Sequence, residues 1–288
     1  MAYLLAIGSA VLYGAADFMG GLTTRRASTI PVVLLSQAAG LILLALMMPL
    51  LPHASPTRAD LLWGAAAGLT GGIGVALLYH ALATGTMAVV APTTAVCAVA
   101  IPVVVSVLLG ERPLPLAVAG IALGMVSIVL VSQQQGGAQP QPGEPGSVPG
   151  RPSGVGIALV AGIAIGLFLL SLAQAGPDAG MWPLLVARTV STSFFAVMAI
   201  AGRRSIRMPA QVTALVVVAG VVDMLANALY LLATRQGPLS IVVTLSSLYP
   251  ASTVLLARIV LGERLRPWQV TGVGCALAAV VLIVSGGR

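Results

Sequence analysis

Hydrophobic residues fill ten long stretches of the chain, and polar residues are mostly confined to the short segments between them. A helix needs roughly twenty apolar residues to cross about 30 Å of hydrocarbon, and each stretch reaches that length. The pattern therefore predicts an all-α integral membrane protein with ten transmembrane helices. We expect them near residues 3–22, 31–51, 60–84, 86–109, 113–133, 154–176, 180–201, 209–234, 237–260 and 266–285.

One short charged sequence occurs twice, each time between two apolar stretches. Leu-Gly-Glu-Arg at residues 109–112 returns at residues 261–264. When the two copies are aligned, Tyr230 falls on Tyr79 and Gly272 on Gly120, so the chain reads as two related halves. Because five helices are an odd number, we expect the halves to be inverted relative to one another, as in many secondary transporters.

A segment rich in Gln, Gly and Pro separates the two halves. Residues 134–153 contain one Glu, one Arg and a single Val, and such a composition cannot bury a core. We therefore expect a first five-helix repeat over residues 1–133, a flexible linker over 134–153, and a second five-helix repeat over 154–288.

Composition supports a membrane protein and argues against other classes. Apolar residues make up 58% of the chain and charged residues only 7%, about a quarter of the share in a soluble domain. The net charge of +7 comes from arginines scattered over short loops, so we expect no nucleic-acid partner. Cys97 and Cys275 lie inside apolar stretches, which argues against a disulfide or a metal site.

Polar side chains at membrane depth are costly and are kept mainly where they face a cavity or a partner. Two sets fall on single helix faces: Ser9, Tyr13 and Asp17 in the first stretch, and Asp223, Asn227, Tyr230 and Thr234 in the eighth. From these and other buried polar positions we predict a solute- or ion-binding site. Its residues are Tyr13, Asp17, Gln37, Tyr79, Arg188, Asp223, Asn227, Tyr230 and Ser247.

Several of these residues also have a structural interpretation. At about 1.5 Å of rise per residue, Arg188 and Asp223 come within reach of each other, so they form either a buried ion pair or a direct ligand contact. Asp17 has no evident partner in its own half. It either carries a proton or meets a cationic group, or else it snorkels to interfacial water or to Arg25 and Arg26 near the helix end. Ser247 binds solute or satisfies a carbonyl of its own helix.

Together, the tract Tyr-Gly-Ala-Ala-Asp-Phe at 13–18, the two Leu-Gly-Glu-Arg turns, the Ser-Ser-Leu-Tyr-Pro tract at 246–250 and the five-plus-five spans resemble the EamA family of the drug/metabolite transporter superfamily. The resemblance implies two inverted five-helix repeats around a central cavity, lined by helices one, three, four, six, eight and nine, and export of small metabolites, amino acids or drugs.

The resemblance also assigns individual positions. Tyr13 and Gly14 match the family's Trp-Gly, and Arg188 matches its arginine in the second helix of a repeat. The chain departs from the pattern at Gln37, which replaces that arginine in the first half. A second departure is the counterpart of Asp17 in helix six, which is apolar around residues 168–169.

Orientation in the membrane is predicted differently by two criteria. Eight arginines lie on the face opposite the termini and four on the face that holds them, so the positive-inside rule places both termini outside. The family resemblance implies termini inside.

We expect a multi-pass transporter of the cell membrane, without a cofactor or metal, that handles a small-molecule solute by alternating access with protons as a coupling ion. We expect the lipid bilayer as its environment and a monomer or homodimer as its assembly. An alternative is a lipid-handling flippase or scaffold of the same fold. A further alternative is an intramembrane aspartyl hydrolase, although the Gly-x-Gly-Asp sequence of such enzymes is missing. We therefore expect no enzymatic activity.

Overall fold

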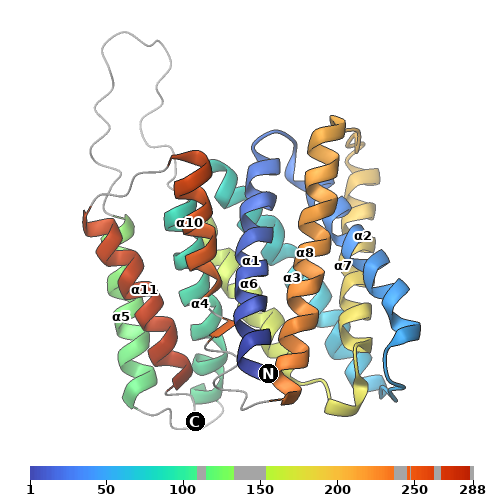
Figure 1. Ribbon diagram of the computed structural model, residues 1–288, viewed down its shortest axis with the longest axis horizontal. Helices are drawn as coiled ribbons and strands as arrows, with labels where there is room; N and C mark the ends of the chain where they lie inside the picture. The colour runs from blue at the N-terminus through green and yellow to red at the C-terminus, as the bar shows by residue number, and fades with distance from the viewer. Residues whose placement is uncertain (109–114, 133–153, 237–244, 247, 263–266, 286–288) are drawn as a thin grey trace.

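The computed structural model describes residues 1–108, 115–132, 154–236, 245–246, 248–262 and 267–285. Within these ranges the chain is helical and contains no strand. The α-helices run side by side as a bundle, shown in Figure 1. They are α1 (Ala2–Thr24), α2 (Thr29–Met47), α3 (Arg58–Thr84), α4 (Met87–Leu108), α5 (Pro115–Ser132), α6 (Val155–Ala173), α7 (Trp182–Ala201), α8 (Ala210–Gln236), α10 (Tyr249–Leu261) and α11 (Pro267–Ser285). Two 3-10 turns, η1 (Met48–Leu50) and η3 (Pro177–Ala179), extend the connections.

Six of the described helices are long and apolar enough to cross a membrane, namely α1, α2 continued by η1, α3, α6, α7 and α8. Three shorter apolar helices lie at Met87–Ala98, Tyr249–Leu261 and Val270–Leu282. Large apolar side chains such as Leu4, Ile42 and Val197 are exposed on the outside of the bundle, where lipid would cover them. The protein is therefore a multi-pass membrane protein.

Four aromatic side chains lie near the starts of helices. Tyr3, Trp63, Trp182 and Trp268 each stand within the first two turns of a helix, and all four are exposed. Amphipathic rings favour the headgroup level of a bilayer. These positions therefore mark where the helices leave the hydrocarbon.

Local signals explain several helix boundaries. Thr57 and Asp60 form a capping box at the start of α3, in which each side chain accepts a hydrogen bond from the other residue's backbone N–H. Gly262, in the second Leu-Gly-Glu-Arg turn, ends α10 with a φ of 65°, a conformation that favours glycine. Glu263 and Arg264, the last two residues of that turn, lie outside the described ranges.

The predicted helix at 237–260 differs from the structure. The described helix in this region, α10, begins at Tyr249, and Leu248 precedes it with a φ of −80° and a ψ of 4°. Pro250 lies in its first turn, where the missing N–H leaves no intrahelical hydrogen bond unmade. Pro250 therefore helps to start a helix here and does not kink the middle of one. Residues 237–244 and 247 lie outside the described ranges.

Helices α1 and α6 cross the bundle in opposite directions. At the end of α1, Arg25 donates a hydrogen bond to the carbonyl of Leu82 near the end of α3, at 3.5 Å. Gly154, which precedes α6, packs near Gly85, which follows α3. The end of α1 and the start of α6 thus share one face, so these two helices run antiparallel. The start of α1 and the end of α11 both lie at the opposite end of the bundle (Figure 1).

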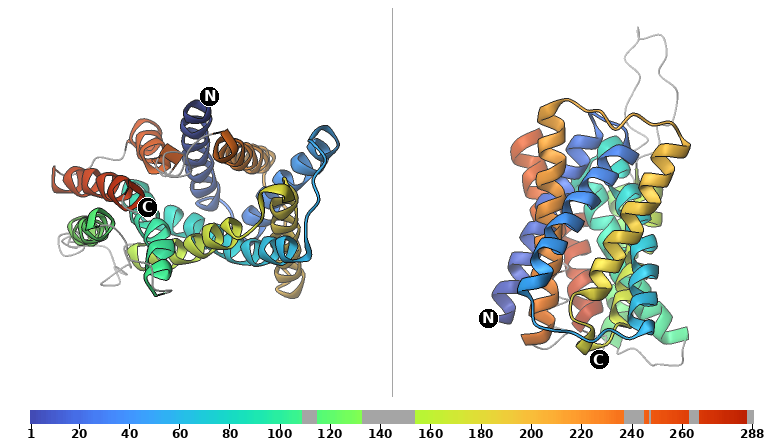
Figure 2. Two further views of the ribbon diagram at one scale, coloured as in Figure 1. Left: turned by 90° about the horizontal axis from the view of Figure 1, so that it is seen from below. Right: turned by 90° about the vertical axis from the view of Figure 1, so that its right-hand side faces the viewer.

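Helix contacts also correspond between the halves. Helix α1 packs against α8 and α3 against α6, while α2 contacts α8 and α3 contacts α7. Helices α5 and α11 pack against each other at one side of the bundle, as Figure 1 and the left view of Figure 2 show. If α1, α2, α3 and α5 are exchanged for α6, α7, α8 and α11, the first four contacts map onto one another in pairs, and the contact between α5 and α11 maps onto itself. Away from α5 and α11, the remaining helices surround the site.

Candidate functional site

A central cavity of about 130 Å³ lies between the helices. One water molecule needs only about 10–15 Å³ of such space, so the cavity accommodates a small solute or several waters. Side chains from α1, α2, α3, α4, α6, α7, α8 and α10 line it, together with Ser246. Helices α2 and α7 therefore line the cavity in addition to the helices that the family resemblance implies.

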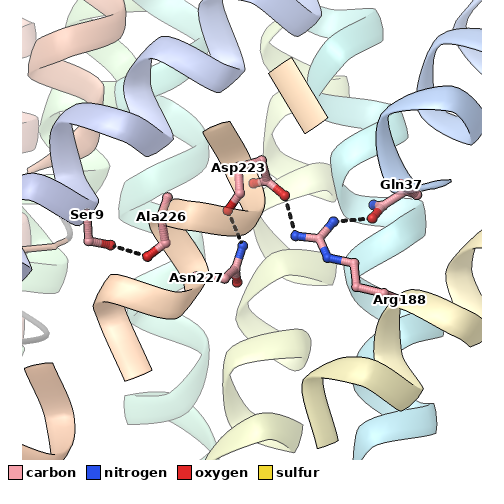
Figure 3. A network of polar contacts seen from close by, with 6 residues as sticks. All are labelled: Ser9, Gln37, Arg188, Asp223, Ala226 and Asn227. Atoms are coloured by element: carbon pink, nitrogen blue, oxygen red, sulfur yellow. Dashed lines mark hydrogen bonds and ion pairs between the residues drawn. The ribbon is translucent and has the colours of Figure 1, made fainter. Parts of the chain in front are cut away.

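Arg188 holds together three helices at the wall of the cavity. Its guanidinium on α7 donates to the Asp223 carboxylate on α8 and to the Gln37 side-chain oxygen on α2 (Figure 3). The side chains of Arg188 and Asp223 are only 9% and 14% exposed. The ion pair predicted from helix depths is thus present, and Gln37 is its second anchor.

A glycine makes room for this network. A Cβ at Gly40, one turn after Gln37, would lie 3.2 Å from the carbonyl oxygen of Gly220 and 3.8 Å from Cζ of Arg188. The absence of a side chain at Gly40 therefore lets α8 approach α2 and leaves space for the guanidinium between them. The same close approach brings Gly220 against the backbone of Ser36.

On the polar face of α1, Ser9 binds a neighbouring helix, whereas Tyr13 and Asp17 line the cavity. Ser9 is fully buried, and its hydroxyl donates to the carbonyl of Ala226 on α8 at 2.9 Å (Figure 3). Tyr13 and Asp17 line the cavity, and Tyr13 packs edge-on against Tyr249 with ring centroids 6.3 Å apart. Asp17 is buried and has no hydrogen-bond or ion-pair partner among the described residues.

The predicted stripe on α8 faces the cavity. Asp223, Asn227 and Tyr230 all line it. Asn227 donates from its amide to the carbonyl of Asp223 at 2.7 Å, which leaves its side-chain oxygen for other partners (Figure 3). The side chain of Thr234 lies outside the described part of the structure.

The wall formed by α6 and α3 is apolar or narrow. Ile165, Phe168 and Leu169 on α6 line the cavity, at the positions where the second half lacks a counterpart of Asp17. Phe168 packs so closely on α3 that a Cβ at Gly71 would lie 2.7 Å from its ring. Glycines at 68, 71 and 72 of α3 also border the cavity. Polarity is therefore concentrated on α1, α2, α7 and α8.

Two of the predicted site residues are not placed in the cavity wall. Tyr79 is 1% exposed and belongs to an apolar cluster with Val32 and Phe195, and its ring fills the space that a side chain at Gly20 would occupy. The structure thus gives Tyr79 a packing position between α3 and α1. Ser247 lies outside the described residues.

Several lining residues are absent from the site predicted from the sequence. Ser246 and Tyr249 flank the predicted Ser247, and both face the cavity. Ser191 lies one turn after Arg188 on α7, and its buried hydroxyl has no partner among the described residues. Its position at i+3 from Arg188 is the signal that could have revealed it. The described residues contain no group of three or more His, Cys, Asp or Glu that could hold a metal ion.

Comparison with known proteins agrees with this architecture. The model of the EamA-like transporter family matches residues 1–133 and 152–285. One solved structure, titled only "Crystal structure of protein", is similar with a TM-score of 0.60 and 17% sequence identity, covering 98% of this chain and 95% of that chain. At that identity the likeness shows the fold alone. No curated protein matches the chain. With the family model matching nearly its whole length, the chain belongs to the EamA-like transporter family.

Proposed function

We propose that this protein is a secondary transporter of the cell membrane that exports a small metabolite, amino acid or drug by alternating access. The observation that carries the proposal is the central cavity, which lies inside a bundle of apolar helices and is bordered by Tyr13, Asp17, Asp223 and Asn227. Polar groups at membrane depth are typical of substrate and ion pathways.

The arrangement of the helices supports two inverted five-helix repeats within ten spans, over residues 1–133 and 154–288 with the linker between them. Helices α1 and α6 run antiparallel, and contacts between the halves exchange in pairs, α1 with α8 for α3 with α6 and α2 with α8 for α3 with α7. Repeats of this kind rock against each other around a fixed midplane site in many transporters. Close glycine contacts, such as Gly68 against the backbone of Ala187, supply surfaces on which the helices move as rigid bodies.

Asp17 is the coupling residue in this proposal. A carboxyl group at membrane depth is stable when it holds a proton or faces a cation. Asp17 therefore alternates between a protonated state and a state paired with a cation. Asp223 is less suited to this role because Arg188 already engages it. The same engagement weakens the hydrolase alternative, which needs two carboxyl groups that share a water molecule.

The test is flux into proteoliposomes under an imposed pH gradient, with a panel of labelled metabolites, amino acids and drugs. Accumulation driven by the gradient is expected for at least one solute and is expected to be lost in Asp17→Asn. Solute exchange without a gradient separates the two ways in which the variant can fail: exchange persists if only the coupling to protons is lost, and exchange is lost as well if Asp17 also binds the solute. Asp178→Asn removes an exposed carboxylate outside the cavity and serves as the control. Scrambling of a labelled phospholipid with no solute flux would favour the lipid-handling alternative.

A further inference from the structure

The charged groups of the cavity do not balance. Among the described residues that line it, Asp17, Arg188 and Asp223 carry a charge when ionised. Arg188 and Asp223 neutralise each other in their ion pair. When Asp17 is deprotonated, it contributes one negative charge that no described lining residue compensates. A cation completes the cavity, whereas an anion would add to the imbalance.

The arginine of the cavity is also poorly placed to receive an anionic solute. Both terminal nitrogens of Arg188 are engaged, one by Asp223 and the other by Gln37. A solute carboxylate would have to displace one of these partners and leave a buried group unsatisfied. This argues against anions, and also against zwitterions, whose carboxylate has no free cationic partner among the described lining residues.

The surroundings of Asp17 suit an ammonium group attached to an apolar body. Tyr13 lies one turn before Asp17 on α1, and its ring is paired with that of Tyr249. Aromatic faces attract cations, most strongly where water is excluded. Phe168 and Leu169 on α6 provide apolar surface in the same cavity. The site thus combines an unmatched carboxyl group, aromatic rings and an apolar wall.

We propose that the solute is an apolar monocation, an amine or quaternary ammonium compound whose charge lies at Asp17 and whose body packs against Phe168 and Leu169. This inference rests on the proposed function in that it takes the cavity as the solute site. One carboxylate cannot hold a proton and pair with an ammonium group together. Binding of the cation on one side of the membrane therefore releases a proton, and release of the cation on the other side takes one up.

Binding to the purified protein in lipid nanodiscs tests the charge preference with four ligands that share a phenylethyl body. They are 2-phenylethylamine, L-phenylalanine, 3-phenylpropionate and 2-phenylethanol, which are cationic, zwitterionic, anionic and neutral near pH 7. The amine is expected to bind at least about tenfold more tightly than the others, as expected for a charged hydrogen bond in a partly dry site. Asp17→Asn is expected to reduce that ratio to near one, and Asp178→Asn is expected to leave it unchanged.

Equal binding of all four ligands, preference for the zwitterion or anion, failure of all four to bind, or a preference that survives Asp17→Asn would each overturn this inference. A monodisperse Asp17→Asn protein that melts like the wild type excludes misfolding as the cause of lost binding. Transport is measured separately in proteoliposomes. Preferential binding of the amine without flux of any solute would overturn the proposed transport function but support the charge preference. Flux of zwitterions or anions alone would support transport and overturn the charge preference.

Discussion

Arg188 of α7 and Asp223 of α8 form an ion pair at the wall of the central cavity, in contact with a third helix through Gln37. Removing one member of a buried pair leaves an uncompensated charge, which costs more than the intact pair contributes. The pair is therefore a tether between helices as well as part of the cavity wall.

Asp223→Asn is expected to destabilise the protein by about 3–5 kcal/mol, because the Arg188 charge stays buried without its partner. The double variant Arg188→Gln with Asp223→Asn is expected to regain much of that loss, since both charges are gone. Thermal unfolding in nanodiscs measures the difference. The single variants Asp223→Asn and Arg188→Gln complete the cycle. If the double variant loses as much stability as the two single variants added together, the two residues do not act as a pair.

Glycines at helix crossings predict a second set of effects. A Cβ at Gly68 would lie 2.3 Å from the carbonyl oxygen of Ala187, and one at Gly220 would lie 2.1 Å from that of Ser36. Gly68→Ala and Gly220→Ala are therefore expected to lower the melting temperature and slow any flux, because the helix backbones must separate. Gly274→Ala is the matched control, since nothing lies within 4 Å of its Cβ position. A drop as large at this control site would contradict the crossing argument.

Replacing either of two buried serines tests whether a loss of stability alone weakens solute binding. Ser9 donates to Ala226 at 2.9 Å beside the cavity helices, while Ser127 on α5 donates to Gly272 on α11 at 2.6 Å. Each change to Ala is expected to cost about 0.6 kcal/mol and at most about 1.7 kcal/mol, the mean and the maximum for such hydrogen bonds in membranes. Only Ser9→Ala is expected to weaken solute binding as well, measured by titration in nanodiscs. Equal binding losses in both variants would argue that α5 and α11 are coupled to the cavity.

The capping box of α3 also joins the two halves of the chain. Asp60 accepts hydrogen bonds from Thr57 and from the backbone N–H of Gly176, at 2.7 Å, in the connection between α6 and α7. Thr57→Ala is expected to cost about 1 kcal/mol of stability through the lost cap. Thr57→Ser keeps the hydroxyl and is expected to behave like the wild type in thermal unfolding. If Thr57→Ser is as unstable as Thr57→Ala, the methyl group and not the cap is responsible.

Much of the architecture is predictable because helix periodicity and membrane thickness act locally. Apolar length predicted the starts of α1, α3 and α7 within two residues. The i, i+4 spacing of Tyr13 with Asp17 and of Asp223 with Asn227 predicted shared faces, and the structure points all four into one cavity. The repeated turns and short motifs led to the family that the comparison confirms.

The sequence by itself therefore determined the membrane environment, most helix positions and the sets of residues that share a face, because each depends on residues close together along the chain. Only the tertiary structure decided that Arg188 bonds to Gln37 as well as Asp223 and that Tyr79 packs against Gly20. It also decided that Asp17 lies buried at the cavity without a hydrogen-bond or ion-pair partner among the described residues. These outcomes depend on how each helix is rotated and how closely it crosses its neighbours. In a bilayer, such crossings are set by packing of small residues and by interhelical hydrogen bonds, which a single helix does not specify.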